Sequence, residues 1–283
     1  MPGMIQTNEK WLCSGTVAKA GYRELLHAAA DAGFDGLSLW RSHYEAAVAE
    51  GLSLNDMTDM LSDLNLRITE IDALLTLIPG EKYVKSEASM VKYDPGFYLE
   101  IASALGARSI NVVQMYDAEI PVHEARELFA GFCERAKLFD LLVTLEFFPP
   151  SGIPNLQQAV NVVAETHQDN GGINFDCWHF HRSGGKLVDI DKIPQGIVTN
   201  IQISDASMKP WSNVTEETLN GRLMPGEGCI DLLGIIDRLE RVNCKLPLSI
   251  EVFNEAFNRL PVSDVVNAQA EGLNSFLKDF KVK

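Results

Sequence analysis

Four short apolar segments in the second half of the chain each carry two polar residues at alternate positions. A small polar residue comes first, and a carboxylate or an amide follows two positions later, with apolar residues on either side. Alternate residues of a strand point to the same face, so the two polar residues of each segment share one face. The four pairs are Thr144 and Glu146, Asn174 and Asp176, Asn200 and Gln202, and Ser249 and Glu251.

The second residue of each pair offers an oxygen atom that can bind a cation. Three buried carboxylates at one point would repel one another, whereas a divalent ion between them makes the arrangement favourable. An all-oxygen set is suited to Mg²⁺ or Mn²⁺ and leaves positions for substrate or water. Each residue taken singly is also explained as a group that caps a strand end or anchors a loop. The common phase of all four predicts one Mn²⁺ or Mg²⁺ ion bound by Glu146, Asp176, Gln202 and Glu251.

These segments belong to a regular alternation of strand-like and helix-like stretches along the whole chain. Short segments rich in Val, Ile and Leu alternate with amphipathic segments, which is typical of parallel strands covered by helices. Eight such units close into a (β/α)8 barrel, so we predict an α/β fold with a single TIM-barrel domain over residues 1–283. The predicted strands are residues 12–17, 35–40, 67–74, 109–116, 142–148, 172–178, 198–206 and 246–253, and a short helix is expected near 189–194.

The barrel places the polar pairs at a functional edge. Active sites of this fold lie at the C-terminal ends of the strands, here strands five to eight. An open doubly wound sheet is the rival fold, but SGTVAKAGY, which follows the first strand, matches its glycine-rich phosphate loop poorly. The sequence therefore favours the barrel with a site at one end.

Composition excludes several classes of function. The chain has 283 residues and a formal net charge of −15, which opposes nucleic-acid binding. Its five cysteines are far apart and include no C-x-x-C pair, which argues against a disulfide framework or a structural zinc site and favours a reducing compartment. No secretory signal is visible, and no apolar stretch approaches the roughly 18 residues that span a membrane. We therefore expect a cytoplasmic protein with no membrane or nucleic-acid partner; apolar barrel exteriors often pair, which is compatible with a homo-oligomer.

The segments that carry the polar residues resemble the xylose isomerase-like barrel superfamily, in particular its sugar phosphate isomerase/epimerase branch, over essentially the whole chain. The resemblance implies that the two glutamates and the aspartate bind a divalent metal. Many members have a histidine at the position of Gln202, and some relatives, including certain dehydroshikimate dehydratases, have a glutamine. A neutral amide oxygen should shift the preference towards Mg²⁺ or Mn²⁺ and away from Zn²⁺. The matching segments are LEFFPP with Glu146, DCWHFHRSGG with Asp176, His179 and Arg182, IQISDA with Gln202 and Asp205, RLMPGEGCIDL with Arg222, and LSIEVF with Glu251.

The predicted site suits proton transfer next to a carbonyl group. A divalent ion that binds a carbonyl and the neighbouring hydroxyl acts as a Lewis acid and holds an enediolate in place. Glu146 and Glu251 are the predicted catalytic bases, and, as in related epimerases, they are expected to address opposite faces of the substrate. His179 is expected to bond a substrate oxygen or shuttle a proton, the alternative being a loop histidine packed on Trp178. The predicted substrate-binding residues are Arg182, Trp178, Arg222 and Trp40.

Some of these roles have structural alternatives that the sequence leaves open. For Arg182 the alternative is a salt bridge that fixes the loop, and for Trp40 it is core packing. The loops at residues 80–93 and 206–228 are expected to determine the substrate.

The leading functional prediction is a metal-dependent isomerase or epimerase of a sugar, a ketose or a cyclic keto-polyol, a small-molecule polyhydroxy carbonyl substrate. The alternative is a metal-dependent dehydratase, similar to dehydroshikimate or keto-inositol dehydratases, that uses the same enolate and expels a β-hydroxyl with acid help from His179. Gln202 slightly favours this alternative. A non-catalytic ligand-binding barrel is a third hypothesis. A DNA-repair role like that of endonuclease IV is rejected, because the chain is acidic and has six histidines that lie mostly in helices.

Overall fold

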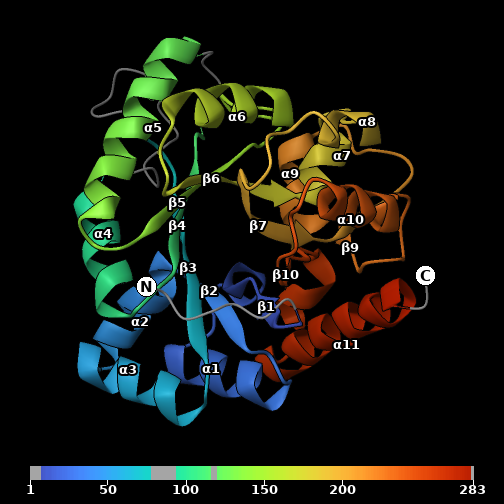
Figure 1. The fold of residues 1–283 in the computed structure, drawn as a ribbon. Helices are drawn as coiled ribbons and strands as arrows, with labels where there is room; N and C mark the ends of the chain where they lie inside the picture. Colours follow the sequence, from blue (N-terminus) through green and yellow to red (C-terminus); the bar gives the residue numbers. More distant parts are fainter. Residues whose placement is uncertain (1–7, 78–93, 116–119, 282–283) are drawn as a thin grey trace.

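Eight parallel strands form a closed barrel in the computed structural model, which describes residues 8–77, 94–115 and 120–281 (Figure 1). Consecutive strands are neighbours, and the first strand closes the barrel by pairing with the last. The predicted (β/α)8 architecture is therefore confirmed. The barrel strands are β1 (Lys10–Leu12), β2 (Gly36–Trp40), β3 (Arg67–Leu74), β4 (Ser109–Val113), β5 (Leu142–Glu146), β6 (Gly171–Asp176), β7 (Val198–Ile203) and β10 (Leu248–Ile250).

Helices surround the strands, and their apolar faces pack on the outside of the barrel (Figure 1). In α10, the buried residues Leu232, Ile235 and Leu239 recur at helical spacing, and the side chain of Asp231 accepts the backbone N–H of Gly234, as expected of an N-cap. No helix in the described ranges is long and apolar enough to cross a membrane. The helices are α1 (Tyr22–Asp31), α2 (Arg41–Ala49), α3 (Leu54–Asp63), α4 (Pro95–Ala104), α5 (Val122–Lys137), α6 (Leu156–Val163), α7 (Cys177–Arg182), α8 (Leu187–Ile190), α9 (Val214–Asn220), α10 (Leu232–Arg241) and α11 (Val262–Lys281), with 3-10 turns η1 (Ser14–Val17), η2 (Ala164–Thr166) and η3 (Glu255–Arg259).

The structure corrects the boundary of the sixth strand. The sequence predicted a strand through Trp178 and a helix near 189–194, but β6 ends at Asp176 and α7 begins at Cys177. The side chain of Asp176 accepts the backbone N–H of His179 at 2.7 Å, so this carboxylate ends the strand and caps the helix at once. A separate short helix, α8, covers Leu187–Ile190. The buried residues Cys177 and Trp178 therefore lie in the first turn of a helix.

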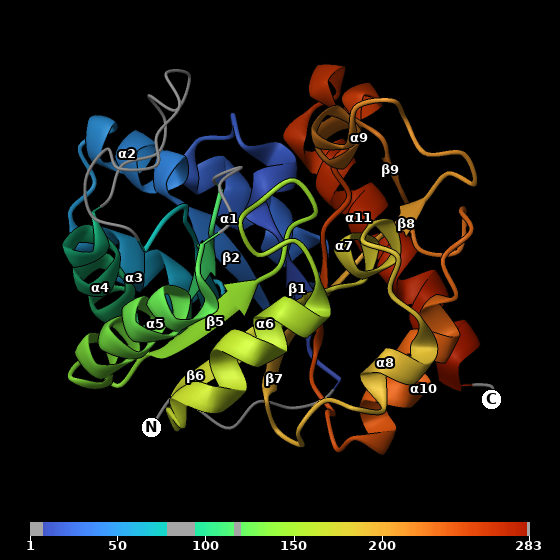
Figure 2. The same ribbon diagram turned by 90° about the horizontal axis from the view of Figure 1, so that it is seen from above.

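A small antiparallel ladder brings a distant segment over the open end of the barrel. In it β8 (Asp205–Ala206) pairs with β9 (Arg222–Leu223), and the intervening segment contains α9. Of these elements, β8 lies beside α7 in Figure 2. An ion pair between Arg182 and Glu217 joins α9 to α7. Both Asp205 carboxylate oxygens accept backbone N–H groups of residues 226–230, which fixes the loop after β9. This folding back carries Arg222 to the C-terminal ends of β6 and β10.

The inside of the barrel is polar along its length, whereas the outer faces of the strands are apolar. Asn111 pairs in register with Thr144, Glu146 with Asn174, and Asp176 with Gln202, so polar residues of adjacent strands lie level with one another. The predicted alternation of strands five to eight therefore brings its polar residues to one interior face. The loop predicted at residues 80–93 lies outside the described residues.

Candidate active site

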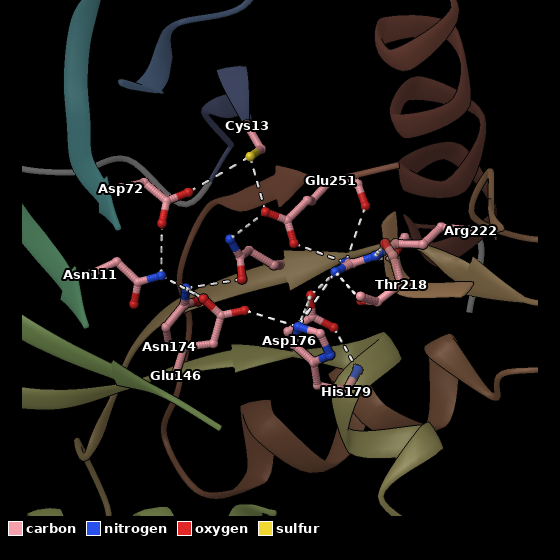
Figure 3. A network of polar contacts seen from close by, with 12 residues as sticks. Cys13, Asp72, Asn111, Glu146, Asn174, Asp176, His179, Thr218, Arg222 and Glu251 are labelled. Atoms are coloured by element: carbon pink, nitrogen blue, oxygen red, sulfur yellow. Dashed lines mark hydrogen bonds and ion pairs between the residues drawn. The ribbon is translucent and has the colours of Figure 1, made fainter. Parts of the chain in front are cut away.

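The four predicted metal ligands are all buried at the C-terminal end of the barrel, and Figure 3 labels three of them, Glu146, Asp176 and Glu251. Gln202 joins its neighbours: its Nε2 donates to Glu251 Oε1 at 3.0 Å, and its Oε1 accepts from Asn174 Nδ2 at 2.9 Å. The same Asn174 amide lies 3.3 Å from Glu146 Oε2. The side chains that the sequence placed on one face thus form one connected group.

His179 lies between two of the carboxylates. Its Nε2 is 3.2 Å from Glu146 Oε1 and 3.8 Å from Asp176 Oδ2. The ring is buried and packs edge-on against Phe148 and Trp178. Burial lowers the pKa of His179 to about 3, which keeps the imidazole neutral at physiological pH.

Arg222 bridges Asp176 and the third carboxylate, Glu251. Its Nη1 donates to Asp176 Oδ2 at 2.7 Å and to Glu251 Oε2 at 2.9 Å. The guanidinium carbon lies 5.2 Å from the centre of the Trp178 ring and 5.1 Å from that of Phe253. Aromatic faces on this cation hold it in place while it neutralises negative charge. Arg222, predicted to bind substrate, is therefore part of the site.

The remaining predicted residues lie at its margin. Arg182 donates to Glu217 and to the carbonyl of Ser207, so its guanidinium fastens the loop after β8 to α7, which corresponds to the structural alternative considered for it. Trp178 is fully buried under Arg222. Trp40 ends β2, and its Nε1 donates to Asp72 Oδ2 at 3.0 Å.

Three residues of the site, Asp72, Asn111 and Cys13, had no predicted role. Asn111 Nδ2 donates to both Asp72 Oδ1, at 2.9 Å, and Glu146 Oε2, at 2.5 Å. Cys13, just after β1, lies with its Sγ 3.0 Å from Glu251 Oε1. The sequence carries a signal for two of them, because Glu70 and Asp72 in β3, and Ser109 and Asn111 in β4, repeat the alternation of the later strands. Cys13 stands alone and has no such signal.

Carboxyl groups outnumber cationic groups in the centre of the site. Burial raises the pKa of Glu146, and Asp176 and Asp72 raise it further. Burial also raises the pKa of Glu251, although Arg222 opposes the shift. Burial opposes ionisation of Asp176 too, but His179 and Arg222 outweigh it and lower the pKa to about 2. Two of the three carboxyl groups therefore resist ionisation until another cation compensates them.

Carboxylates of the site belong to two groups of side chains that could each hold a divalent cation, and neither group contains all three predicted carboxylate ligands. One ligand atom from each of Glu146, Asp176 and His179 lies within 4.8 Å of the others, and a second group of this kind consists of Cys13, Asp72 and Glu251. Glu251 belongs to the second group and not to the first, because Arg222 stands between it and Asp176. An added cation would stabilise the ionised form of these buried carboxyl groups. This is the behaviour expected of side chains that bind a metal ion.

The fold agrees with the family to which the chain is similar. The family described as xylose isomerase-like TIM barrel matches residues 26–279, most of the sequence. The chain therefore belongs to this family, as the resemblance of its motifs predicted.

Sequence identity to three individual relatives lies between 17% and 26%. An inosose isomerase of Bacillus licheniformis is 25% identical over 147 residues, 51% of this chain and 52% of that protein. A 3-dehydroshikimate dehydratase of Pseudomonas aeruginosa is 26% identical over 264 residues, 90% of this chain and 39% of that protein. The chain thus spans about half, or less, of the length of these curated relatives. The solved structure of the IolI protein with a bound zinc atom has a TM-score of 0.84 at 17% identity, over 96% of this chain and 99% of that chain, and shows the shared fold.

Proposed function

We propose that the protein is a divalent-metal-dependent isomerase or epimerase of a neutral polyhydroxy ketone, such as a keto-inositol, that acts by proton transfer beside the carbonyl group. The observation that carries this proposal is the pair of buried glutamates, Glu146 and Glu251, at the ends of strands that β6 and β7 separate. Both belong to a site that fits a cation. The similarity to an inosose isomerase supports the same class of reaction.

Mn²⁺ or Mg²⁺ is the proposed ion, bound by Glu146, Asp176, Gln202 and Glu251. Three carboxylates and an amide are oxygen donors, which hard cations prefer. When bound, the ion supplies Lewis-acid stabilisation of negative charge on a substrate oxygen. The zinc of the IolI structure belongs to that protein, and Zn²⁺ is the natural comparison in any metal titration.

The contacts of the two glutamates suit them to act as bases. Glu251 Oε1 is held by Cys13 and Gln202, and its Oε2 by Arg222, so the orientation of this carboxylate is fixed from three sides. Glu146 is held by Asn111 through one oxygen and lies against His179 through the other. Preorganised groups transfer protons without first having to find their geometry. We assign the proton on one face of the substrate to Glu251 and that on the other face to Glu146.

The charges around the site favour a neutral substrate. In the part of the chain that the structure describes, Arg222 is paired with Asp176 and Glu251, and Arg182 is paired with Glu217. A substrate carboxylate or phosphate would therefore have to compete with protein carboxylates for either guanidinium. Hydroxyl groups of a polyol need only accept or donate hydrogen bonds.

Dehydration is the second candidate reaction, and two observations favour it. The dehydratase of Pseudomonas aeruginosa matches 90% of the chain, and, by the resemblance of its motifs, Gln202 corresponds to a glutamine in certain dehydroshikimate dehydratases. This reaction would use Glu251 for the same first proton. His179, neutral at physiological pH and beside Glu146, would donate a hydrogen bond to the departing hydroxyl, and the proton that Glu251 takes from carbon would leave with that hydroxyl as water.

Solvent exchange separates the two reactions. The Mn²⁺-loaded protein is incubated in D₂O with a keto-inositol and, in a parallel sample, with 3-dehydroshikimate, and proton NMR follows the carbon beside the carbonyl. We expect deuterium at this carbon of the keto-inositol and a second ketone isomer without loss of water. Release of water from 3-dehydroshikimate would make the dehydratase the correct assignment. If neither deuterium exchange nor loss of water occurs with any metal, both proposed reactions are contradicted and a ligand-binding barrel is the remaining hypothesis.

The proposed setting of the enzyme is the cytoplasm. All five cysteines are free thiols, as expected of a protein in a reducing compartment. A homo-oligomer remains part of the proposal, and sedimentation velocity measures it directly.

A further inference from the structure

A hydrogen-bond chain runs through the barrel beneath the site and ends on the proposed base Glu146. It begins at Glu70 in β3, which is 1% exposed and faces the barrel interior. Thr144 Oγ1 lies 2.6 Å from Glu70 Oε2 and 3.2 Å from Asn111 Oδ1. Asn111 Nδ2 in turn donates to Glu146 Oε2 at 2.5 Å. Two side chains, Thr144 and Asn111, therefore connect Glu70 to Glu146.

The Asn111 amide is the critical link in this chain. Its Nδ2 donates to two carboxylates, Asp72 and Glu146, and both of its N–H hydrogens are thereby used. Its Oδ1 is buried with the rest of the side chain, and the Thr144 hydroxyl supplies the hydrogen bond that keeps the oxygen pointing away from the two carboxylates. An amide turned the other way would place oxygen against oxygen at Glu146. The threonine hydroxyl thus determines which atom of Asn111 meets the base.

Glu70 determines in turn where the hydroxyl of Thr144 points. A hydroxyl has one hydrogen to donate, and Glu70 Oε2 and Asn111 Oδ1 both lie within its reach. When Glu70 carries a proton on Oε2, it donates to Thr144, whose own hydrogen then serves Asn111. Asn200 Nδ2 donates to Glu70 Oε1 at 3.2 Å, so this carboxyl group is held through one oxygen and presents the other to Thr144.

We infer that Thr144, oriented by Glu70, is a positioning residue of the enzyme: through Asn111 it fixes the Glu146 carboxylate for metal binding and proton transfer. The hydroxyl of Thr144 bonds to Glu70, to the carbonyl of Ile110 and to Asn111, and not to any of the four proposed metal ligands, so its effect on Glu146 passes through Asn111. The inference rests on the proposed function of Glu146. It adds a requirement for the Thr144 hydroxyl, which lies two residues before Glu146 on β5.

The test is Mn²⁺ affinity by titration calorimetry, together with kcat and KM, for three variants. Thr144→Val keeps the shape of the side chain and removes the hydroxyl, and Thr144→Ser keeps the hydroxyl. Ser109→Ala is the matched control, because Ser109 Oγ also lies 3.2 Å from Glu70 Oε2 but no contact joins it to Asn111. Loss of an outer hydrogen bond of this kind weakens metal affinity or activity by about 10–100-fold.

We expect Thr144→Val to weaken Mn²⁺ affinity and lower kcat by at least about tenfold, with little change in KM. Thr144→Ser and Ser109→Ala should remain within about twofold of the wild type, and near-ultraviolet circular dichroism should show all variants folded. A Thr144→Val protein with wild-type affinity and kcat, or a Thr144→Ser protein as impaired as Thr144→Val, would overturn the inference. A wild-type protein that neither binds Mn²⁺ nor turns over a ketone would refute the proposed function instead.

Discussion

Glu251→Gln is expected to lower kcat by about 10²–10⁴-fold, because a positioned general base contributes rate enhancement of this size. Glutamine preserves the volume of the side chain and can still accept the bond from Arg222 through its oxygen. It cannot take a proton from carbon, and it removes one negative charge from the predicted metal site. We therefore expect lost turnover, weakened Mn²⁺ affinity and little change in fold. Steady-state kinetics with saturating Mn²⁺ measures the first effect separately from the second.

Glu255→Gln is a suitable control for this variant. Glu255 lies four residues further along, exposed in the 3-10 turn η3, so the same change of charge occurs outside the site. Its kcat should match that of the wild type. If Glu251→Gln retains more than about a tenth of wild-type kcat, Glu251 is not the base assigned here.

Arg222→Met is expected to destabilise the metal-free protein by about 3–5 kcal/mol, the usual cost of removing one partner of a buried ion pair. Methionine fills the space between Trp178 and Phe253 but leaves Asp176 and Glu251 without their shared cation. The loss should increase as the pH is raised. Arg222 opposes the rise in the pKa of Glu251, so without it this pKa rises further; a carboxyl group with a raised folded-state pKa loses stability as pH increases.

Urea unfolding in the presence of a chelator measures this loss. The control is Arg238→Met, because Arg238 pairs with Asp191 at the surface, where ion pairs contribute about 1 kcal/mol or less. Equal unfolding midpoints for Arg222→Met and Arg238→Met would show that Arg222 does not compensate the buried carboxylates.

Short-range patterns were sufficient to predict the barrel and the gathering of polar side chains. Thr144 and Glu146 alternate with apolar neighbours, and the same alternation in three further strands predicts a common interior face. The parallel sheet then brings residues of equal phase to the same level, as the register of Asp176 with Gln202 shows. Periodicity therefore predicted that the polar residues of these four strands share one interior face.

Other features depend on contacts between distant parts of the chain. Arg222 meets Asp176 across 46 residues, and Cys13 meets Glu251 across 238. No local pattern determines either distance, because each depends on loop geometry and on the closure of the barrel. The end of β6 was predicted two residues too late, since an apolar run through Cys177 and Trp178 looks the same in a strand and in the first turn of a buried helix. The same alternation of polar and apolar residues occurs in strands three and four, where it includes Asp72 and Asn111.

The central claim, that a divalent cation binds among Glu146, Asp176, Gln202 and Glu251, is tested most directly by anomalous diffraction at the manganese edge. The crystal would be grown from protein loaded with Mn²⁺. We predict one strong anomalous peak among the oxygen atoms of these four side chains, and a much weaker peak at the same position for Glu251→Gln. The absence of a peak among these side chains at full Mn²⁺ loading, or a peak coordinated by other residues, would contradict the assignment.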